Sequence, residues 1–264
     1  GANGGNTANY IGVDSQIIYN DGGNQLFLAN NGGISRTNII PPTSSATWAS
    51  VINSLSGTEN TTKPTGWTGV TREIPSFNKL RPGEKGIPSM VKFNNSLYVA
   101  RNVQSEASGS TTQTPVRGEL WRCTSGCTTM ANWNKIFDSS ESGNPNNKAI
   151  SMVNIVEIPS GTQKYLYIGF DNETDGAEVF KSTNGDTFTK VGISGLGPKA
   201  QEGTDDIKRN KHIISFASVY YDLKSYLYVN IGCLSDFTDN GVCDRDRTTG
   251  ATDFSIKVFR QIDQ

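Results

Sequence analysis

Clustered carboxylates in residues 236–250 are the part of this sequence best suited to chemistry. Four aspartates lie there among Asn, Thr and Gly residues: Asp236, Asp239, Asp244 and Asp246. Carboxylate and carbonyl oxygens are the ligands that Ca²⁺ takes in proteins. We therefore treat these four as a candidate calcium site and expect no other cofactor. The alternative is an ordinary polar loop in which Arg245 and Arg247 neutralise the acids.

Two long polar insertions interrupt otherwise regular stretches of the chain, at residues 102–117 and 233–253. Long loops in a compact domain often carry function because they are exposed and free to vary. We expect these two loops to meet a partner. The side chains that we assign to this binding surface are Arg117, Asp236, Asp239, Arg245 and Arg247.

A complete catalytic set is harder to find. The single histidine, His212, follows a charged stretch, and no Gly-x-Ser-x-Gly turn is present to carry a serine nucleophile. Glycosidases need two carboxyl groups at a defined separation, which a sequence with 25 acidic residues leaves open. We therefore assign no catalytic residue.

The composition limits the classes of partner. The formal net charge is −1 and basic residues are scattered, which argues against nucleic acid and anionic lipid. No apolar run approaches the ~20 residues of a membrane-spanning helix. Gly, Asn, Ser and Thr are abundant, as in proteins built from short strands and tight turns.

The four cysteines form two close pairs, Cys123 with Cys127 and Cys233 with Cys243. Three connectivities exist in principle, and local pairing is the simplest of them. Disulfides persist in oxidising compartments. We therefore expect a secreted or cell-surface protein.

A repeated pattern sets the expected architecture. Four runs begin with Leu and an aromatic residue: Leu26-Phe27, Leu97-Tyr98, Leu166-Tyr167 and Leu227-Tyr228. Each is followed by a second run that ends in a basic residue: Arg36, Arg122, Lys181 and Arg260. A unit that recurs four times along the chain indicates an array of similar modules. We interpret the basic residues as either extending into solvent from a strand end or pairing with carboxylates of the neighbouring module.

The units predict an all-β fold, a β-propeller of four-stranded antiparallel blades in one domain. Strands are predicted at 16–20, 25–29, 33–37, 47–52, 88–93, 96–101, 118–123, 132–137, 150–158, 165–170, 177–182, 187–191, 213–221, 226–232 and 254–260. The four units are residues 14–52, 87–137, 149–192 and 212–264. The last lacks an outer strand, which residues 7–13 could supply. A fifth blade around Gly66–Val70, a larger propeller and a β-sandwich are the alternatives.

One turn resembles a known motif. Ser182-Thr183-Asn184-Gly185-Asp186-Thr187-Phe188 is similar to the Asp-box of bacterial-neuraminidase-repeat propellers, although it is one residue shorter, with Asn184 in the Asp position and Phe188 in place of Trp. The resemblance implies a sialidase-like propeller in which this turn lies away from the active site. Its residues are turn formers, with Phe188 packing back between sheets.

These observations favour a non-enzymatic, extracytoplasmic β-propeller, a bacterial surface or secreted protein that binds a glycan or protein partner. The first alternative is a carbohydrate-active enzyme, sialidase-like or another glycosidase. The second is a structural module of a larger envelope or filament protein. Neither nucleic acid nor a transmembrane segment is expected.

Overall fold

The computed structural model describes residues 17–20, 25–29, 33–38, 49–52, 64–65, 67, 86–104, 115–157, 164–172, 174–196, 212–221, 224–232 and 257–263. The elements within these ranges are β-strands and three single turns of 3-10 helix: η3 (Met130–Asn132), η4 (Ser139–Ser142) and η5 (Ser194–Leu196). No helix in this part of the chain is long and apolar enough to span a membrane.

Fifteen strands form four antiparallel sheets, and neighbours in each sheet are neighbours in the sequence. The first sheet holds β1 (Ile17–Asn20), β2 (Gln25–Ala29), β3 (Ile34–Asn38) and β4 (Ala49–Ile52). The second holds β5 (Ser89–Phe93), β6 (Ser96–Gln104), β7 (Pro115–Cys123) and β8 (Trp133–Asp138). The third holds β9 (Ala149–Glu157), β10 (Lys164–Asp171), β11 (Glu178–Ser182) and β12 (Thr189–Val191). The fourth holds β13 (His212–Tyr221), β14 (Lys224–Gly232) and β15 (Lys257–Asp263).

This arrangement confirms the predicted all-β propeller of stacked four-stranded sheets, with the fourth sheet one strand short. Most strand boundaries differ from the sequence-based prediction by one to three residues, and two of these differences change the interpretation. The β6–β7 hairpin continues to Gln104 and Pro115 because Val103 and Arg117 still pair across it. The insertion predicted at residues 102–117 is therefore shorter. At the other boundary Asn132 belongs to η3 and β8 begins at Trp133.

The recurring Leu-aromatic pair packs the second and third sheets against both of their neighbours. Leu97 faces the first sheet and Tyr98 faces the third. Leu166 faces the second sheet and Tyr167 faces the fourth. Successive residues of a strand point to opposite faces, so one dipeptide supplies both contacts. The repeat is thus the mark of a sheet that is buried on both sides.

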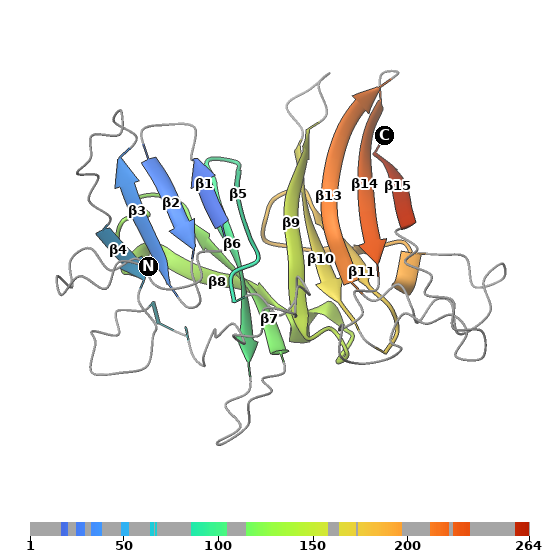
Figure 1. Ribbon diagram of the computed structural model, residues 1–264, viewed down its shortest axis with the longest axis horizontal. Coiled ribbons are helices and arrows are strands. Elements are labelled where there is room, and N and C mark those ends of the chain that lie inside the picture. Colours follow the sequence, from blue (N-terminus) through green and yellow to red (C-terminus); the bar gives the residue numbers. More distant parts are fainter. Residues whose placement is uncertain are drawn as a thin grey trace, which may run out of the picture.

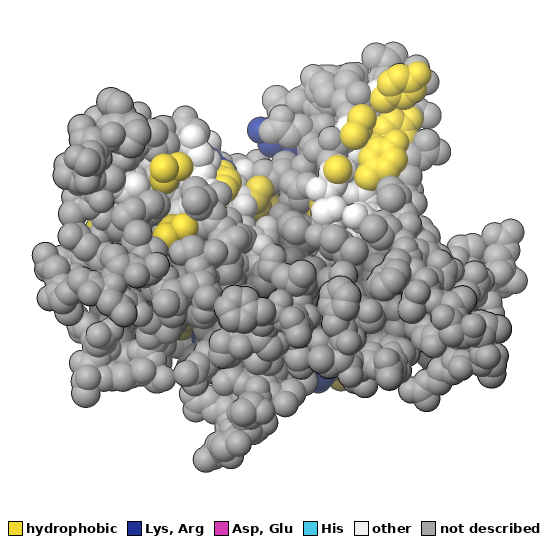
Figure 2. All heavy atoms as spheres, in the orientation of Figure 1, with side chains coloured by type: hydrophobic (Ala, Val, Ile, Leu, Met, Phe, Trp, Pro, Cys, Tyr) yellow, Lys and Arg dark blue, Asp and Glu magenta, His cyan; other side chains and the backbone are white. Residues whose placement is uncertain are grey.

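Within the part of the chain that the structure describes, one face of the fourth sheet has no other sheet packed on it. Leu227 packs toward the third sheet, as expected, while Tyr228 is only partly buried. Pairing of Ala217 with Tyr228, and of Val219 with Tyr226, places these side chains on one face. Together with the exposed Tyr221 they form the apolar surface over β13 and β14 at the upper right of Figure 2. In the first three sheets the corresponding face is covered by the next sheet.

The predicted fifth blade falls largely outside the described residues, as does the N-terminal segment 7–13. The part that is described, residues 64–67, is a turn in which the Trp67 amide donates to the Pro64 carbonyl at 3.1 Å. Trp67 is fully buried, and its ring centroid lies 4.9 Å from that of Trp121. This tryptophan therefore anchors the connecting segment to the second sheet.

Candidate functional site

Buried charged and amide side chains gather at one end of the sheets, which we call the polar end. It comprises the last residues of β6, β8 and β10 and the first residues of β7, β9, β11 and β13, along the lower edge of Figure 1. Among the described residues, the buried side chains of this kind are Arg101, Asn102, Glu119, Asp138, Asn147, Asp171, Asn172 and Glu178. The opposite end, which we call the turn end, carries the tight β5–β6 turn, the longer β7–β8 connection and the β11–β12 turn.

A buried ionic cluster lies at the polar end of the second sheet. The Arg101 Nη1 donates to Glu119 Oε2 at 2.7 Å, and the indole Nε1 of Trp121 donates to the same oxygen at 2.9 Å. Arg117 Nε and Nη2 both donate to Glu119 Oε1 at 2.8 Å. Burial lowers the pKa of Arg101, and the charge of Arg117 adds to that shift, although Glu119 opposes both. Two cations thus share one carboxylate.

The second and third sheets are tied together beside this cluster. Asn102 uses both ends of its amide on Ile150: Nδ2 donates to the carbonyl at 2.9 Å and Oδ1 accepts from the backbone amide at 2.8 Å. The backbone of Gly118 passes so near that a Cβ there would lie 2.7 Å from the Ile150 nitrogen. Such contacts fix the two blades in one relative position.

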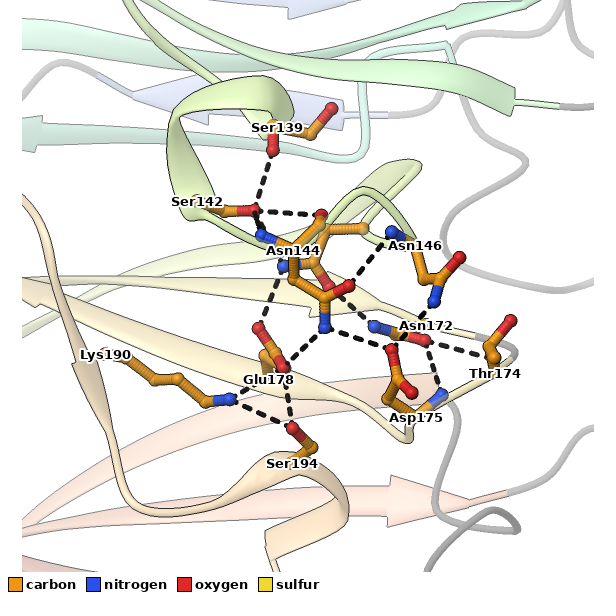
Figure 3. Close-up of polar contacts among 11 residues, drawn as sticks. Ser139, Ser142, Asn144, Asn146, Asn172, Thr174, Asp175, Glu178, Lys190 and Ser194 are labelled. Atoms are coloured by element: carbon orange, nitrogen blue, oxygen red, sulfur yellow. Dashed lines mark hydrogen bonds and ion pairs between the residues drawn. The ribbon is translucent and has the colours of Figure 1, made fainter.

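A hydrogen-bond network joins the connector between the second and third sheets to the third sheet and is centred on Glu178 (Figure 3). Its Oε1 accepts from Asn144 Nδ2 at 2.9 Å, from Lys190 Nζ at 2.7 Å and from Ser194 Oγ at 2.7 Å. Its Oε2 accepts from Asn147 Nδ2 at 2.9 Å. Burial alone would raise the pKa of Glu178, but these donors outweigh it and leave the pKa lowered. Glu178 is therefore an anion at neutral pH.

Asp175 extends the same network toward solvent (Figure 3). It accepts from Asn144 Nδ2 at 3.1 Å and from Asn146 Nδ2 at 2.9 Å. Its own backbone amide is fixed by Asn172 Oδ1 at 2.8 Å, and Asn172 Nδ2 donates to Asn147 Oδ1 at 2.9 Å. The Asn146 bond is the main reason why the pKa of Asp175 is lowered.

The network predicts how stability depends on pH. Because the pKa of Glu178 is lower in the folded than in the unfolded chain, its stabilising contribution is complete above the ordinary value of 4.5 and is lost as the pH falls through the folded value. We expect urea midpoints to decline below pH ~5, and to decline less in Glu178→Gln. The control is Glu141→Gln, at an exposed carboxylate of η4. Identical pH profiles for Glu178→Gln and the unmodified chain would contradict this role.

A pocket of about 450 Å³ opens at the polar end, between the ionic cluster and the network. It is lined by Arg117, Ser139, Ser140, Gly143, Pro145, Asn147 and Lys148. Arg117 contacts Glu119 of the cluster, and Asn147 contacts Glu178 of the network. The lining offers hydroxyl, amide and cationic groups and contains no carboxylate. Such groups bind polar, hydroxylated or anionic ligands.

The structure places one predicted binding residue, Arg117, in this pocket. The others, Asp236, Asp239, Arg245 and Arg247, lie outside the described residues, as do the calcium ligands Asp244 and Asp246 and the pair Cys233–Cys243. Among the described residues no group of three or more His, Cys, Asp or Glu side chains could hold a metal ion. The predicted Cys123–Cys127 disulfide is confirmed, with the Cα atoms 5.7 Å apart.

The motif-like turn lies at the turn end, between β11 and β12. Ser182 Oγ accepts from the Gly185 amide at 2.8 Å, and Asn184 Oδ1 accepts from the amides of Asp186 and Thr187, both at 2.9 Å. Gly185 has a φ of 83°, in the left-handed region that favours glycine. The turn is thus held by local side-chain bonds.

Contacts across the blades extend from this turn. Phe188 packs on Phe137 of the second sheet at a ring-centroid distance of 4.9 Å. Arg122 Nη1 donates to Asp186 Oδ1 at 2.5 Å. This bond confirms, for the second unit, that the recurring basic residue pairs with a carboxylate of the next blade. In the third unit Lys181 instead lies over the ring of Tyr165, 4.4 Å from its centroid.

Sequence reasoning missed Glu119, Asn147, Lys148 and Glu178. Glu119 had a visible signal, because a carboxylate in the centre of an apolar strand must have a buried partner. Asn147 and Lys148 lie in the connector between the second and third units. Nothing local distinguishes them from the other polar residues of that segment.

Comparison with known proteins gives distant structural similarity only. No protein-family model and no curated protein sequence matches the chain. An α-L-arabinanase from Cellvibrio cellulosa, solved with arabinohexaose, is 14% identical, covering 94% of this chain and 71% of that one at a TM-score of 0.42. A GH43_12 protein from a capybara gut metagenome is 12% identical, covering 93% and 40% at a TM-score of 0.41. A glycosyl hydrolase from Bacteroides ovatus is 13% identical at a TM-score of 0.35, and the chain spans 46% of its length.

These neighbours correct two expectations. Their names are those of carbohydrate-cleaving enzymes, which disagrees with the main prediction of a non-enzymatic adhesion module and agrees with the carbohydrate-active alternative. None of them is named as a sialidase, so the expected Asp-box sialidase type has no support from these neighbours. The turn at Ser182–Phe188 is held by hydrogen bonds among its own residues. Unrelated chains can therefore form the same hairpin turn.

Proposed function

We propose that this chain is a carbohydrate-active protein of the glycoside hydrolase class, and that its saccharide binds in the pocket at the polar end. The observation that carries the proposal is the lining of that pocket. Ser139 and Ser140 contribute hydroxyl groups, Asn147 lines the pocket with its amide bonded to neighbouring side chains, and Arg117 and Lys148 add cationic donors. Sugar hydroxyls both donate and accept hydrogen bonds, so they require such a mixture.

Rigid support of the pocket agrees with this proposal. Asn147 is buried and makes three bonds, to Ser142, Asn172 and Glu178, all at 2.9 Å. Arg117 is held in one plane by two bonds to Glu119. A site whose side chains are fixed before binding loses little entropy when the ligand arrives.

Hydrolysis of a glycosidic bond needs one protonated and one ionised carboxyl group in most families. Asp138, Asp175 and Glu178 all have lowered pKa values, so each is of the ionised kind. None of the three lines the pocket, and Asp175, the most exposed of them, is our candidate for the ionised member. The disulfide in the β7–β8 turn agrees with an extracytoplasmic location, where polysaccharides are met.

The test is a panel of plant and microbial polysaccharides, assayed for binding and for release of reducing ends. We expect at least one polysaccharide to be bound and cleaved. Asn147→Ala should weaken its binding about tenfold, because a buried hydrogen-bonding group and the order it imposes are both lost. Asn134→Ala, at an exposed asparagine on β8, is the matched control. A chain that neither binds nor cleaves any saccharide of the panel would refute the proposal.

A further inference from the structure

One part of the polar-end pocket is lined by carbon rather than by polar side chains. Pro145 and Gly143 both line the pocket, and both are exposed. Asn144 lies between them in the sequence but not in the lining, and its amide donates to Asp175 and Glu178. Residues 143 and 145 therefore offer the pocket an apolar ring and backbone, with no polar side-chain group.

The Pro145 ring is held in a fixed position. The Asn147 amide donates to the Asn144 carbonyl at 3.1 Å, which closes a four-residue turn with Pro145 in its second position. Asn144 Oδ1 accepts from the Asn146 amide at 3.0 Å, and Asn144 Nδ2 ties the turn to Glu178 at 2.9 Å (Figure 3). Proline also restricts its own φ. The network around Glu178 thus positions an exposed apolar ring before any ligand arrives.

The space beside this ring is open. Gly143 has a φ of 74°, in the left-handed region that favours glycine. A Cβ at Gly143 would meet no atom of the described residues within 4 Å, its chain neighbours aside. Glycine therefore keeps both the backbone turn and the mouth of the pocket free of a side chain. A flat ring can lie against Pro145 without a clash from residue 143.

An apolar ring selects among sugars by the face that they present. A sugar ring carries hydroxyls around its edge and C–H groups on its faces, and burying carbon surface is favourable. In galactose the axial 4-hydroxyl lies on one face, so the C–H groups of C3, C4 and C5 gather on the other. In glucose, the C4 epimer, these C–H groups are divided between the two faces. A proline platform therefore gains more contact from the galacto configuration.

We propose that Pro145 determines the specificity of the polar-end pocket, and that the pocket selects a galacto-configured saccharide whose C–H face lies on the Pro145 ring. This inference rests on the proposed function and narrows its substrate class. The hydroxyls at the edge of the sugar ring contact the polar groups of the same lining. The preference arises from apolar contact, so it applies to binding whether or not the bound saccharide is cleaved.

The experiment measures binding of β-1,4-galactotetraose and of cellotetraose, whose rings differ in configuration at C4, by calorimetry. We expect galactotetraose to bind about fivefold more tightly, as one additional apolar contact allows. Pro145→Ala should weaken galactotetraose about fivefold and cellotetraose by less than about twofold, so that the preference is lost. Pro145→Val is the matched control. It loses the same restriction on φ but restores apolar surface, and should keep most of the preference.

The outcomes separate an apolar contact from a purely structural role. The Ala and Val variants should melt within ~2 °C of each other, which verifies that both are folded. Equal affinities for the two tetraoses, tighter binding of cellotetraose, or a preference unchanged by Pro145→Ala would overturn the inference. An equal loss in both variants would assign Pro145 to fixing the turn and would also overturn it.

The same measurements distinguish this inference from the proposed function. If neither tetraose binds, but another polysaccharide of the panel binds and Asn147→Ala weakens it, the galacto preference is wrong and the proposed function stands. If no saccharide binds, both are wrong.

Discussion

Glu119→Ala should cost about 3–5 kcal/mol of the free energy of unfolding, because Arg101 would remain fully buried without its carboxylate. Glu119 also accepts from Arg117 and from the Trp121 indole, so one substitution leaves three donors without their acceptor. Urea denaturation at pH 7 measures the loss. The control is Glu141→Ala on η4, which should change stability by less than ~0.5 kcal/mol.

A double-mutant cycle isolates the ion pair from the loss of packing. Arg101→Met removes the other charge, so the double variant Arg101→Met/Glu119→Ala should be more stable than the sum of the two single losses predicts. The pocket should respond as well, since Arg117 would lose the group that fixes its plane. Additive losses, or a cost below ~1 kcal/mol for Glu119→Ala, would contradict the account of this cluster.

Tyr167→Ala and Tyr228→Ala should differ greatly, although the two residues hold the same place in the repeat. Tyr167 is fully buried between the third and fourth sheets, so its removal should cost about 3–5 kcal/mol, as for other large aromatic residues in a core. Tyr228 lies on the open face of the fourth sheet and should cost about 1 kcal/mol or less. Both values come from chemical denaturation of the single variants.

An equal cost for the two tyrosines would show that the open face is covered in solution. The cover would then be a further part of this chain or a second copy of it. Sedimentation at several concentrations separates these cases, because only a second copy changes the mass. We expect Tyr228→Ala to leave the mass unchanged.

The fold could be predicted because its signals are local. Asn94 and Asn95 adopt φ values of 46° and 64°, the left-handed conformation that a tight hairpin turn needs and that asparagine tolerates well. Asn184-Gly185 marks another turn in the same way. Between such turns, alternation of apolar side chains defines a strand whatever the rest of the chain does. The Leu-aromatic pair also marked the strands, and its role in joining neighbouring sheets emerged only from the packing.

The site could not be predicted because it depends on contacts between units. Glu119 and Arg101 are 18 residues apart, and they meet only because β6 and β7 pair in the observed register. Glu178 of β11 meets Asn147, which lies 31 residues earlier in the connector before β9. Arg117 was chosen from the sequence for its place in a long loop, whereas the structure places it in β7 as part of an ion pair. The clustered aspartates of residues 236–250 are a stronger signal in the sequence than any of these positions.

The two ends of the molecule provide an internal comparison for the claim that the saccharide binds at the polar end. The pocket at the polar end, with Arg117 and Lys148 in its lining, is matched by one of about 320 Å³ at the turn end, whose lining includes Lys92 and Thr124–Thr128. Amide chemical-shift mapping during titration with an oligosaccharide chosen from the panel tests both at once. We predict shifts confined to residues 117 and 139–148, with residues 124–128 unmoved. Shifts at residues 124–128 without shifts at 139–148 would contradict the assignment of the binding site to the polar end.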